Sequence, residues 1–195
     1  MLQISRRSKE EPGHAAALAR GAVAACTVVP IRLLVIIAAI TPAVALASLK
    51  YLIAPAVVGV AILLTGLVKA EQGEAVEAEA RSPLNVISSL KMAGFLTLAL
   101  AAVEWVGGGW GASGVLTSAV LLGFGDTDAL TVSMARMGRD EGMVELAAQA
   151  VAVGLLSNTV FKAGFALALG SAKYRGYAAV GLGLMGVAIG VGFLI

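Results

Sequence analysis

The 195 residues form a chain that is too apolar for a soluble protein: 59% are hydrophobic and 13% are charged, against about 25% charged residues in soluble domains. With a mean hydropathy of +0.93, the composition indicates an integral membrane protein that contacts the lipid bilayer. The 14 Lys and Arg against 12 Asp and Glu give a net charge of +2, which argues against nucleic acid as a partner. One cysteine, Cys26, and one histidine, His14, exclude a disulfide framework and a Cys/His metal site.

Six apolar runs are long enough, or nearly so, to cross a membrane as helices, which takes about 20 residues. They cover residues 17–40, 51–69, 84–106, 110–125, 146–170 and 176–195. The fourth run would extend only about 24 Å at about 1.5 Å per residue. The sequence therefore predicts one membrane domain over residues 1–195, an all-α polytopic transmembrane helix bundle with about six spans, of which the fourth is short or broken.

The positions of Lys and Arg in the predicted loops indicate an orientation, because cytoplasmic loops carry an excess of these residues. With the N-terminus inside, eight basic residues fall on the cytoplasmic side and three on the outer side. The first set is Arg6, Arg7, Lys9, Arg20, Lys69, Arg81, Arg136 and Arg139, and the second is Lys50, Lys173 and Arg175. We expect both termini to be cytoplasmic, unless residues 110–137 re-enter the membrane.

The chain contains a candidate internal repeat at an offset of 130 residues. Residues 6–32 align with residues 136–162, and the sign of the charge agrees at five positions. Because four predicted spans separate the copies, we expect a parallel repeat: repeat one at about 6–69, repeat two at about 126–195, and linking spans at 84–125. Repeat one has no counterpart to the acidic residues 126–128, so either a longer natural chain or a partner chain would supply it.

Two aspartates end the short fourth run, in the sequence GFGDTDA at 123–129. Glycine weakens a helix end, and Asp and Thr compete for backbone hydrogen bonds, so we expect the helix to break there. On an unwound segment Asp126 and Asp128 could converge with free carbonyl groups in an oxygen-rich pocket for a cation or a proton. A structural reading also stays open, with Asp128 as the N-cap of a short helix over 129–137 and Asp126 neutralising Lys162 or Arg136.

The fifth run carries a polar face. Gly154, Asn158 and Lys162 recur every four residues, with Ser157 and Thr159 at the edges, so they lie on one side of a helix. Burying Lys at a helix centre costs about 2.5 to 3.5 kcal/mol, which indicates that this face turns toward the bundle interior. The long side chain of Lys162 would extend back toward the aspartates, and we expect an electrostatic coupling between them.

These residues form a candidate ion pathway and indicate a membrane transporter or channel for a small ion. Asp126 and Asp128 would hold a metal cation or carry protons, Asn158 and Thr159 would supply neutral ligands, and Lys162 would be the counter-charge. The supporting residues are Thr127, Ser133, Arg136, Ser157 and Arg32. The alternative is a non-transporting membrane subunit or regulator, in which the same residues form a structural ion-pair network. An enzyme is not expected, because no catalytic motif is present.

The last run indicates close contact between helices. It contains two small-xxx-small pairs, Ala179 with Gly183 and Gly186 with Gly190, which let helix backbones approach closely. Together with the incomplete repeat one, they suggest a homo-oligomer, most simply a two-fold dimer.

Several of these motifs resemble a known family, the membrane domain of unknown function 4010, which is found in MgtC/SapB-type proteins. The residues that carry the resemblance are Gly-Asp-Thr-Asp-Ala at 125–129, Ser133, Ala135-Arg136, Ser157-Asn158-Thr159 and Lys162-Ala163. This chain has Ser82-Pro83 where members carry Asn-Pro. The resemblance implies a multi-pass protein of the cell inner membrane and an association with magnesium homeostasis through neighbouring domains.

Overall fold

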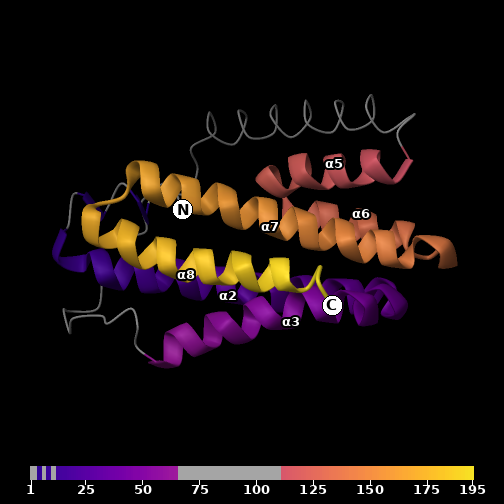
Figure 1. Ribbon diagram of the computed structural model, residues 1–195, viewed down its shortest axis with the longest axis horizontal. Coiled ribbons are helices and arrows are strands. Elements are labelled where there is room, and N and C mark those ends of the chain that lie inside the picture. The colour runs from indigo at the N-terminus through magenta and orange to yellow at the C-terminus, as the bar shows by residue number, and fades with distance from the viewer. Residues whose placement is uncertain (1–3, 6–7, 10–11, 66–110) are drawn as a thin grey trace.

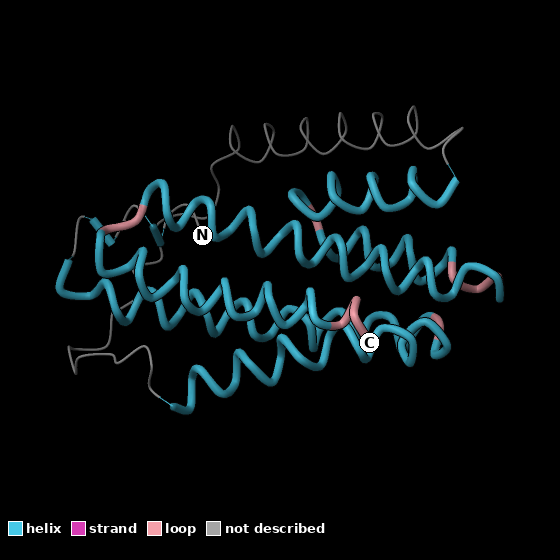
Figure 2. Tube along the Cα trace, viewed as in Figure 1, coloured by secondary structure: helices cyan, strands magenta, loops and turns pink. Residues whose placement is uncertain are grey.

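The computed structural model describes residues 4–5, 8–9, 12–65 and 111–195. Every regular element in these residues is helical (Figure 2), which confirms the all-α prediction. The α-helices are α2 (Ala15–Ile40), α3 (Pro42–Thr65), α5 (Gly111–Gly125), α6 (Thr127–Met137), α7 (Val144–Leu169) and α8 (Ala172–Val191), and the 3-10 turns are η1 (Pro12–His14) and η2 (Glu141–Met143).

Four of the described helices are long and apolar enough to cross a membrane: α2, α3, α7 and α8, with 26, 24, 26 and 20 residues. The apolar helix α5 has only 15 residues, so the fourth apolar run is short, as predicted. The predicted third span, 84–106, lies outside the described residues. The bundle is therefore that of a multi-pass membrane protein.

The helix α3 begins nine residues earlier than the predicted second span. A single residue, Thr41, separates α2 from α3; its backbone is extended, with φ −149°. Pro42 then starts α3, where a fixed φ and a missing N–H are no disadvantage. Lys50, which was expected in an outer loop, lies inside α3. The polar residues before position 51 look like a loop in the sequence but belong to the first turns of this helix.

The four long helices run between two ends of the bundle. At the first, named here the Ala15 end, the beginnings of α2 and α8 pack against the ends of α3 and α7. The residues in contact are Ala15, Ile62, Ala166 and Tyr174. At the other, the Lys50 end, Lys50 Nζ of α3 lies 2.9 Å from Glu145 Oε1 at the start of α7, and the ring of Tyr51 lies 4.8 Å from that of Phe193, which follows α8. Helices α2 and α8 therefore run toward the Lys50 end, and α3 and α7 run toward the Ala15 end (Figure 1).

Helices α5 and α6 form a re-entrant hairpin instead of a crossing (Figure 1). Helix α5 enters from the Lys50 end and stops beside the middle of α7, where Asn158 Nδ2 donates to the carbonyl of Gly123 at 2.8 Å. Helix α6 returns to the Lys50 end, where Thr41 Oγ1 donates to the carbonyl of Ala135 at 2.7 Å. The two helices extend about 22 and 16 Å at about 1.5 Å per residue, so the hairpin tip lies near half the depth of the bundle.

The hairpin changes the topology that the sequence suggests. Because it returns to the end from which it entered, α2 and α7 run in opposite directions, and the parallel relation expected for the copies at 6–69 and 126–195 is not found between them. The beginning of α2 and the end of α8 lie at opposite ends of the bundle, which corresponds to the exception that the sequence left open, a re-entrant segment 110–137. The domain boundaries and the orientation of the chain stay predictions.

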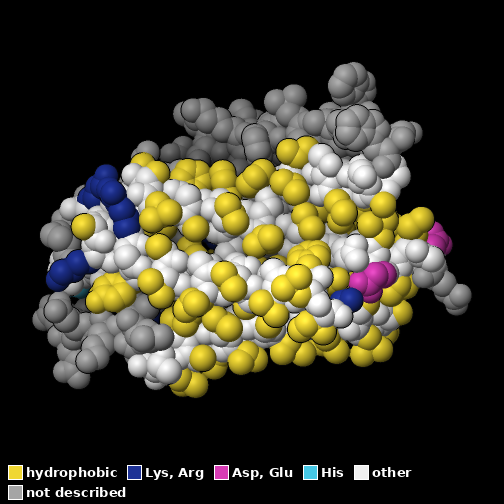
Figure 3. Space-filling model, in the orientation of Figure 1, with side chains coloured by type: hydrophobic (Ala, Val, Ile, Leu, Met, Phe, Trp, Pro, Cys, Tyr) yellow, Lys and Arg dark blue, Asp and Glu magenta, His cyan; other side chains and the backbone are white. Residues whose placement is uncertain are grey.

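The outer surface of the described helices is strongly apolar between the two ends. Large side chains such as Val35, Val57 and Val187 are 64%, 60% and 65% exposed. Hydrophobic side chains cover the middle of the face in Figure 3, with Lys and Arg gathered at one end and acidic residues toward the other. Such a surface suits a hydrocarbon environment, so these helices contact lipid.

Candidate functional site

Asp126 forms the tip of the hairpin and caps α6. Its backbone is extended, with φ −141° and ψ 99°, so α5 ends there and α6 starts at the next residue. Its Oδ1 accepts hydrogen bonds from the N–H of Asp128 at 2.9 Å and of Ala129 at 3.1 Å. The predicted helix break is confirmed, but the N-cap is Asp126, not Asp128, because α6 starts two residues earlier than expected.

Asp128 forms an ion pair with Arg32 of α2. Arg32 Nη2 lies 2.8 Å from Asp128 Oδ1, and the two side chains are 52% and 40% exposed. Arg32 lies about 12 Å before the end of α2, a helix longer than the hydrocarbon core is thick. The ion pair therefore lies within the depth of the membrane and on the surface of the described bundle. Charged groups at such a depth need water or protein around them.

Lys162 does not pair with either aspartate, contrary to the predicted coupling. No ion pair links Lys162 to any residue that the structure describes. Helix α6 turns back beside α2, so Asp128 meets Arg32 of that helix instead. Arg32 occupies the counter-charge position that the sequence suggested for Lys162.

The polar face of α7 turns inward, as its spacing predicts. Ser157, Asn158 and Thr159 are 8%, 8% and 6% exposed. Ser157 Oγ donates to the carbonyl of Val120 at 2.8 Å, and Asn158 Nδ2 donates to that of Gly123. Gly123 belongs to the last turn of α5, where carbonyl groups lose their helical partners. Val120 lies one turn earlier, so its carbonyl accepts the Ser157 hydroxyl in addition to its helical partner. These two side chains therefore hold the hairpin at its depth, whereas Thr159 Oγ1 donates to Leu155 in its own helix.

Two glycines let α5 approach α7 closely. A Cβ on Gly123 would meet the carbonyl oxygen of Gly154, and a Cβ on Gly154 would meet the side chain of Leu130 in α6 and the carbonyl oxygen of Ala119 at 3.2 Å. Gly154 therefore lies where α7 contacts both arms of the hairpin. The sequence places it on the polar face but does not show that its role is this contact.

The remaining supporting residues lie along α6. Thr127 is buried, and its carbonyl accepts from Thr131 Oγ1 at 2.7 Å. Ser133 and Arg136 lie on the exposed side of the helix. Arg136 is in the last turn, where a positive charge interacts favourably with the helix dipole.

The two aspartates do not form a ready-made metal centre. Among the described residues, no three His, Cys, Asp or Glu side chains are grouped so that they could hold a metal ion. Asp126 is engaged by the first turn of α6, and Asp128 by Arg32. These interactions use Oδ1 of each carboxylate, so a cation between the aspartates would depend on the two Oδ2 atoms or compete with Arg32 and the cap.

Comparison with known proteins identifies the family. The family model of DUF4010, a domain of unknown function, matches residues 1–170, which include the hairpin and the polar face of α7. No curated protein and no solved structure matches the chain. Since the match covers most of the sequence, the chain belongs to the DUF4010 family.

Proposed function

We propose that this protein is a membrane transporter or channel for a small ion, either a cation or a proton, in the inner membrane. The observation that carries the proposal is the Arg32–Asp128 ion pair beside a helix break at half the depth of the bundle. Ionisable residues within a membrane most often mark ion pathways. Broken helices at the midplane are the usual place for ion sites in transporters.

In this proposal Asp128 is the group that binds the ion, and Arg32 is its internal competitor. At rest the guanidinium occupies the carboxylate at 2.8 Å. An arriving cation, or a proton that neutralises the carboxylate, releases Arg32 from its partner. The Arg32 guanidinium and the ion compete for the same carboxylate. Arg32 therefore limits how long the ion stays bound and favours turnover over tight binding.

The neighbouring polar residues have secondary roles in this proposal. Asn158 uses its amide N–H on Gly123 and keeps a carbonyl oxygen that can accept or coordinate. The Thr159 hydroxyl has lone pairs for the same purpose. Asp126 keeps the tip folded and, through the charge of its carboxylate, favours cations near it. Lys162 lies one turn after Asn158 in α7 and would be a second positive charge along the pathway.

We further infer that a second copy of the chain covers the ion pair. In a lone chain Arg32 and Asp128 would be 52% and 40% exposed at a depth where their contact would be lipid, which is costly for charged groups. A two-fold dimer is the commonest assembly. It would enclose the pair in protein and leave room for water along it, so the pathway would lie at the dimer interface.

The second candidate is a non-transporting membrane subunit or regulator. The hydrogen bonds favour it in one respect, because those of Asp126, Ser157 and Asn158 stabilise the hairpin and its contact with α7. In that case the Arg32–Asp128 pair would only link α2 to α6.

Flux measurements in liposomes separate the two candidates. The purified chain would be tested with monovalent cations, Mg²⁺ and protons. We expect flux of at least one of these ions, its loss in Asp128→Asn, and unchanged flux in the control Asp140→Asn, whose side chain is exposed near the Lys50 end. Absence of flux for every ion would favour the non-transporting subunit, whereas full flux in Asp128→Asn would show that transport does not depend on Asp128.

A further inference from the structure

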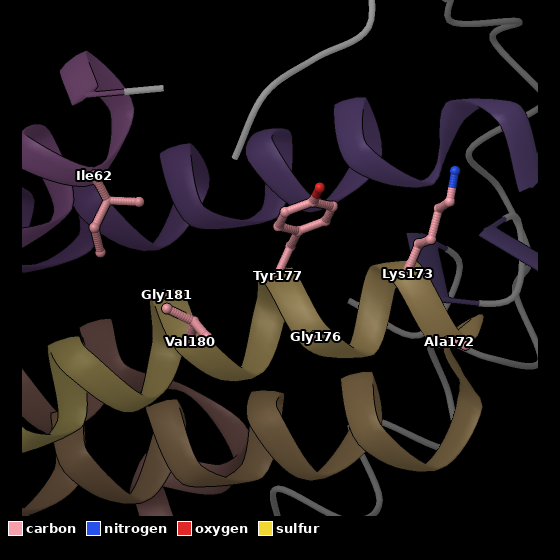
Figure 4. Close-up of a pocket in the computed structure, with 7 residues that line it drawn as sticks. All are labelled: Ile62, Ala172, Lys173, Gly176, Tyr177, Val180 and Gly181. Atoms are coloured by element: carbon pink, nitrogen blue, oxygen red, sulfur yellow. The ribbon is translucent and has the colours of Figure 1, made fainter. Parts of the chain in front are cut away.

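A groove opens on the outer face of the bundle near the Ala15 end, between the end of α3 and the first half of α8 (Figure 4). Its volume is about 510 Å³, within the usual range of about 300–1,000 Å³ for sites that hold a small molecule. The residues that line it are Ile62, Ala172, Lys173, Gly176, Tyr177, Val180 and Gly181. None of them belongs to the candidate ion pathway.

The groove is apolar along its length and polar at one end. Ile62, Val180 and Gly181 supply the apolar part, and Gly176 leaves it open because a Cβ there would meet nothing within 4 Å. Lys173 and Tyr177 extend from the same side of α8, with the ammonium and hydroxyl groups directed away from the helix (Figure 4). Two polar groups thus lie one helical turn apart above an apolar surface.

Among the described residues, those at the end of the bundle around the groove carry positive charge. The described basic residues there are Lys9, Arg20, Lys173 and Arg175. Arg20 Nη2 donates to the carbonyl of Leu63 at 3.3 Å, next to Ile62 of the groove, so a second cation lies close to its rim. The acidic residues that the structure describes all fall within 126–145, in the hairpin and at the Lys50 end. Figure 3 shows the resulting gathering of Lys and Arg at one end.

We propose that this groove binds one anionic phospholipid. The phosphate lies against the Lys173 ammonium and the Tyr177 hydroxyl, and an acyl chain follows Ile62 and Val180. Lys173 is the second residue of α8, so it is at the membrane boundary, where Lys and Tyr side chains meet lipid headgroups. Basic pockets between membrane helices select anionic headgroups. The apolar length of the groove favours a lipid over free phosphate, and the proposal does not depend on ion transport.

Native mass spectrometry of the full chain in mild detergent tests this assignment, with phosphatidylglycerol and phosphatidylcholine added in equal amounts. We expect the protein to retain one phosphatidylglycerol, with a preference of about fivefold from one cationic side chain near the headgroup. Lys173→Gln should remove the preference while lipid still binds. Gly176→Leu should fill the groove and reduce retention of both lipids. The control Arg139→Gln removes an exposed charge at the Lys50 end and should retain phosphatidylglycerol with the same preference as the original chain.

Three results would overturn the proposal: equal retention of both lipids, an unchanged preference in Lys173→Gln, or displacement of phosphatidylglycerol by an equal concentration of inorganic phosphate. Thermal unfolding without added lipid serves as the folding check for each variant. If Gly176→Leu lowers the unfolding temperature, Lys173→Gln, which changes an exposed side chain, decides the question alone.

Discussion

Arg32 Nη2 of α2 lies 2.8 Å from Asp128 Oδ1 of α6, and this ion pair joins the first long helix to the re-entrant hairpin. Breaking it on one side leaves an uncompensated charge at membrane depth, so Arg32→Met or Asp128→Asn alone should destabilise the protein more than both together. We expect a coupling free energy of about 0.5–3 kcal/mol between the two sites. A double-mutant cycle measured by thermal unfolding in nanodiscs gives this value.

The matched control is a cycle of Asp128→Asn with Lys162→Met, which should be additive within about 0.5 kcal/mol, since no ion pair joins these residues. Additivity in the Arg32 cycle together with coupling in the Lys162 cycle would mean that Lys162, not Arg32, is the partner of Asp128.

Asp126 has a capping role that can be separated from its charge. Asp126→Ala removes the acceptor for two backbone N–H groups and should lower stability by about 0.5–2 kcal/mol. Asp126→Asn and Asp126→Ser keep a capping oxygen and should remain close to the original stability in a thermal melt. Flux in Asp126→Asn then reports the charge alone; equal melting of the Ala and Asn variants would rule out the cap.

The contact between Gly123 and Gly154 leaves no space for a side chain. Gly123→Ala would bring a methyl group against the carbonyl of Gly154, and we expect a loss of about 1–3 kcal/mol, as for other overpacked sites. The control is Gly164→Ala in α7, where a Cβ meets nothing within 4 Å and alanine is the better helix former. Thermal unfolding of the two variants should change in opposite directions; a neutral Gly123→Ala would show that α5 and α7 are farther apart.

The re-entrant hairpin predicts a specific labelling pattern. In a Cys26→Ala background, Ala112→Cys at the start of α5 and Gly142→Cys after α6 should react from the same side of the membrane. Ala172→Cys at the start of α8 should react from the other side. All three positions are exposed. Membrane-impermeant maleimides on sealed vesicles provide the measurement, and reaction of Ala112→Cys and Gly142→Cys from opposite sides would show that the segment crosses completely.

Local features of this fold can be predicted from the sequence. The apolar runs place the beginnings and ends of α2, α5, α7 and α8 within a few residues, because each run is bounded by charges or helix breakers. The glycines and aspartates at 123–128 predict the break between α5 and α6, and the four-residue spacing predicts that Asn158 faces inward. These inferences depend only on neighbours along the chain.

The relations between distant segments could not be predicted in the same way. Whether 110–137 crosses or re-enters depends on how Asn158 and Ser157 of α7 meet the carbonyl groups of α5, and no local pattern contains that contact. The partner of Asp128 depends in turn on the direction of the hairpin, which brings α6 beside Arg32. Whether residues 110–137 cross or re-enter therefore decides both the relative direction of the two repeat copies and the partner of Asp128.

The hydrogen bonds from Ser157 and Asn158 to α5 also determine the order of assembly during biogenesis. The ribosome completes α5 and α6 before it makes α7, so Ser157 and Asn158 are not yet present when the two arms of the hairpin are made. Neither arm is long enough to span the bilayer by itself. We therefore expect the hairpin to dock only after α7 has been inserted, as a late step of assembly.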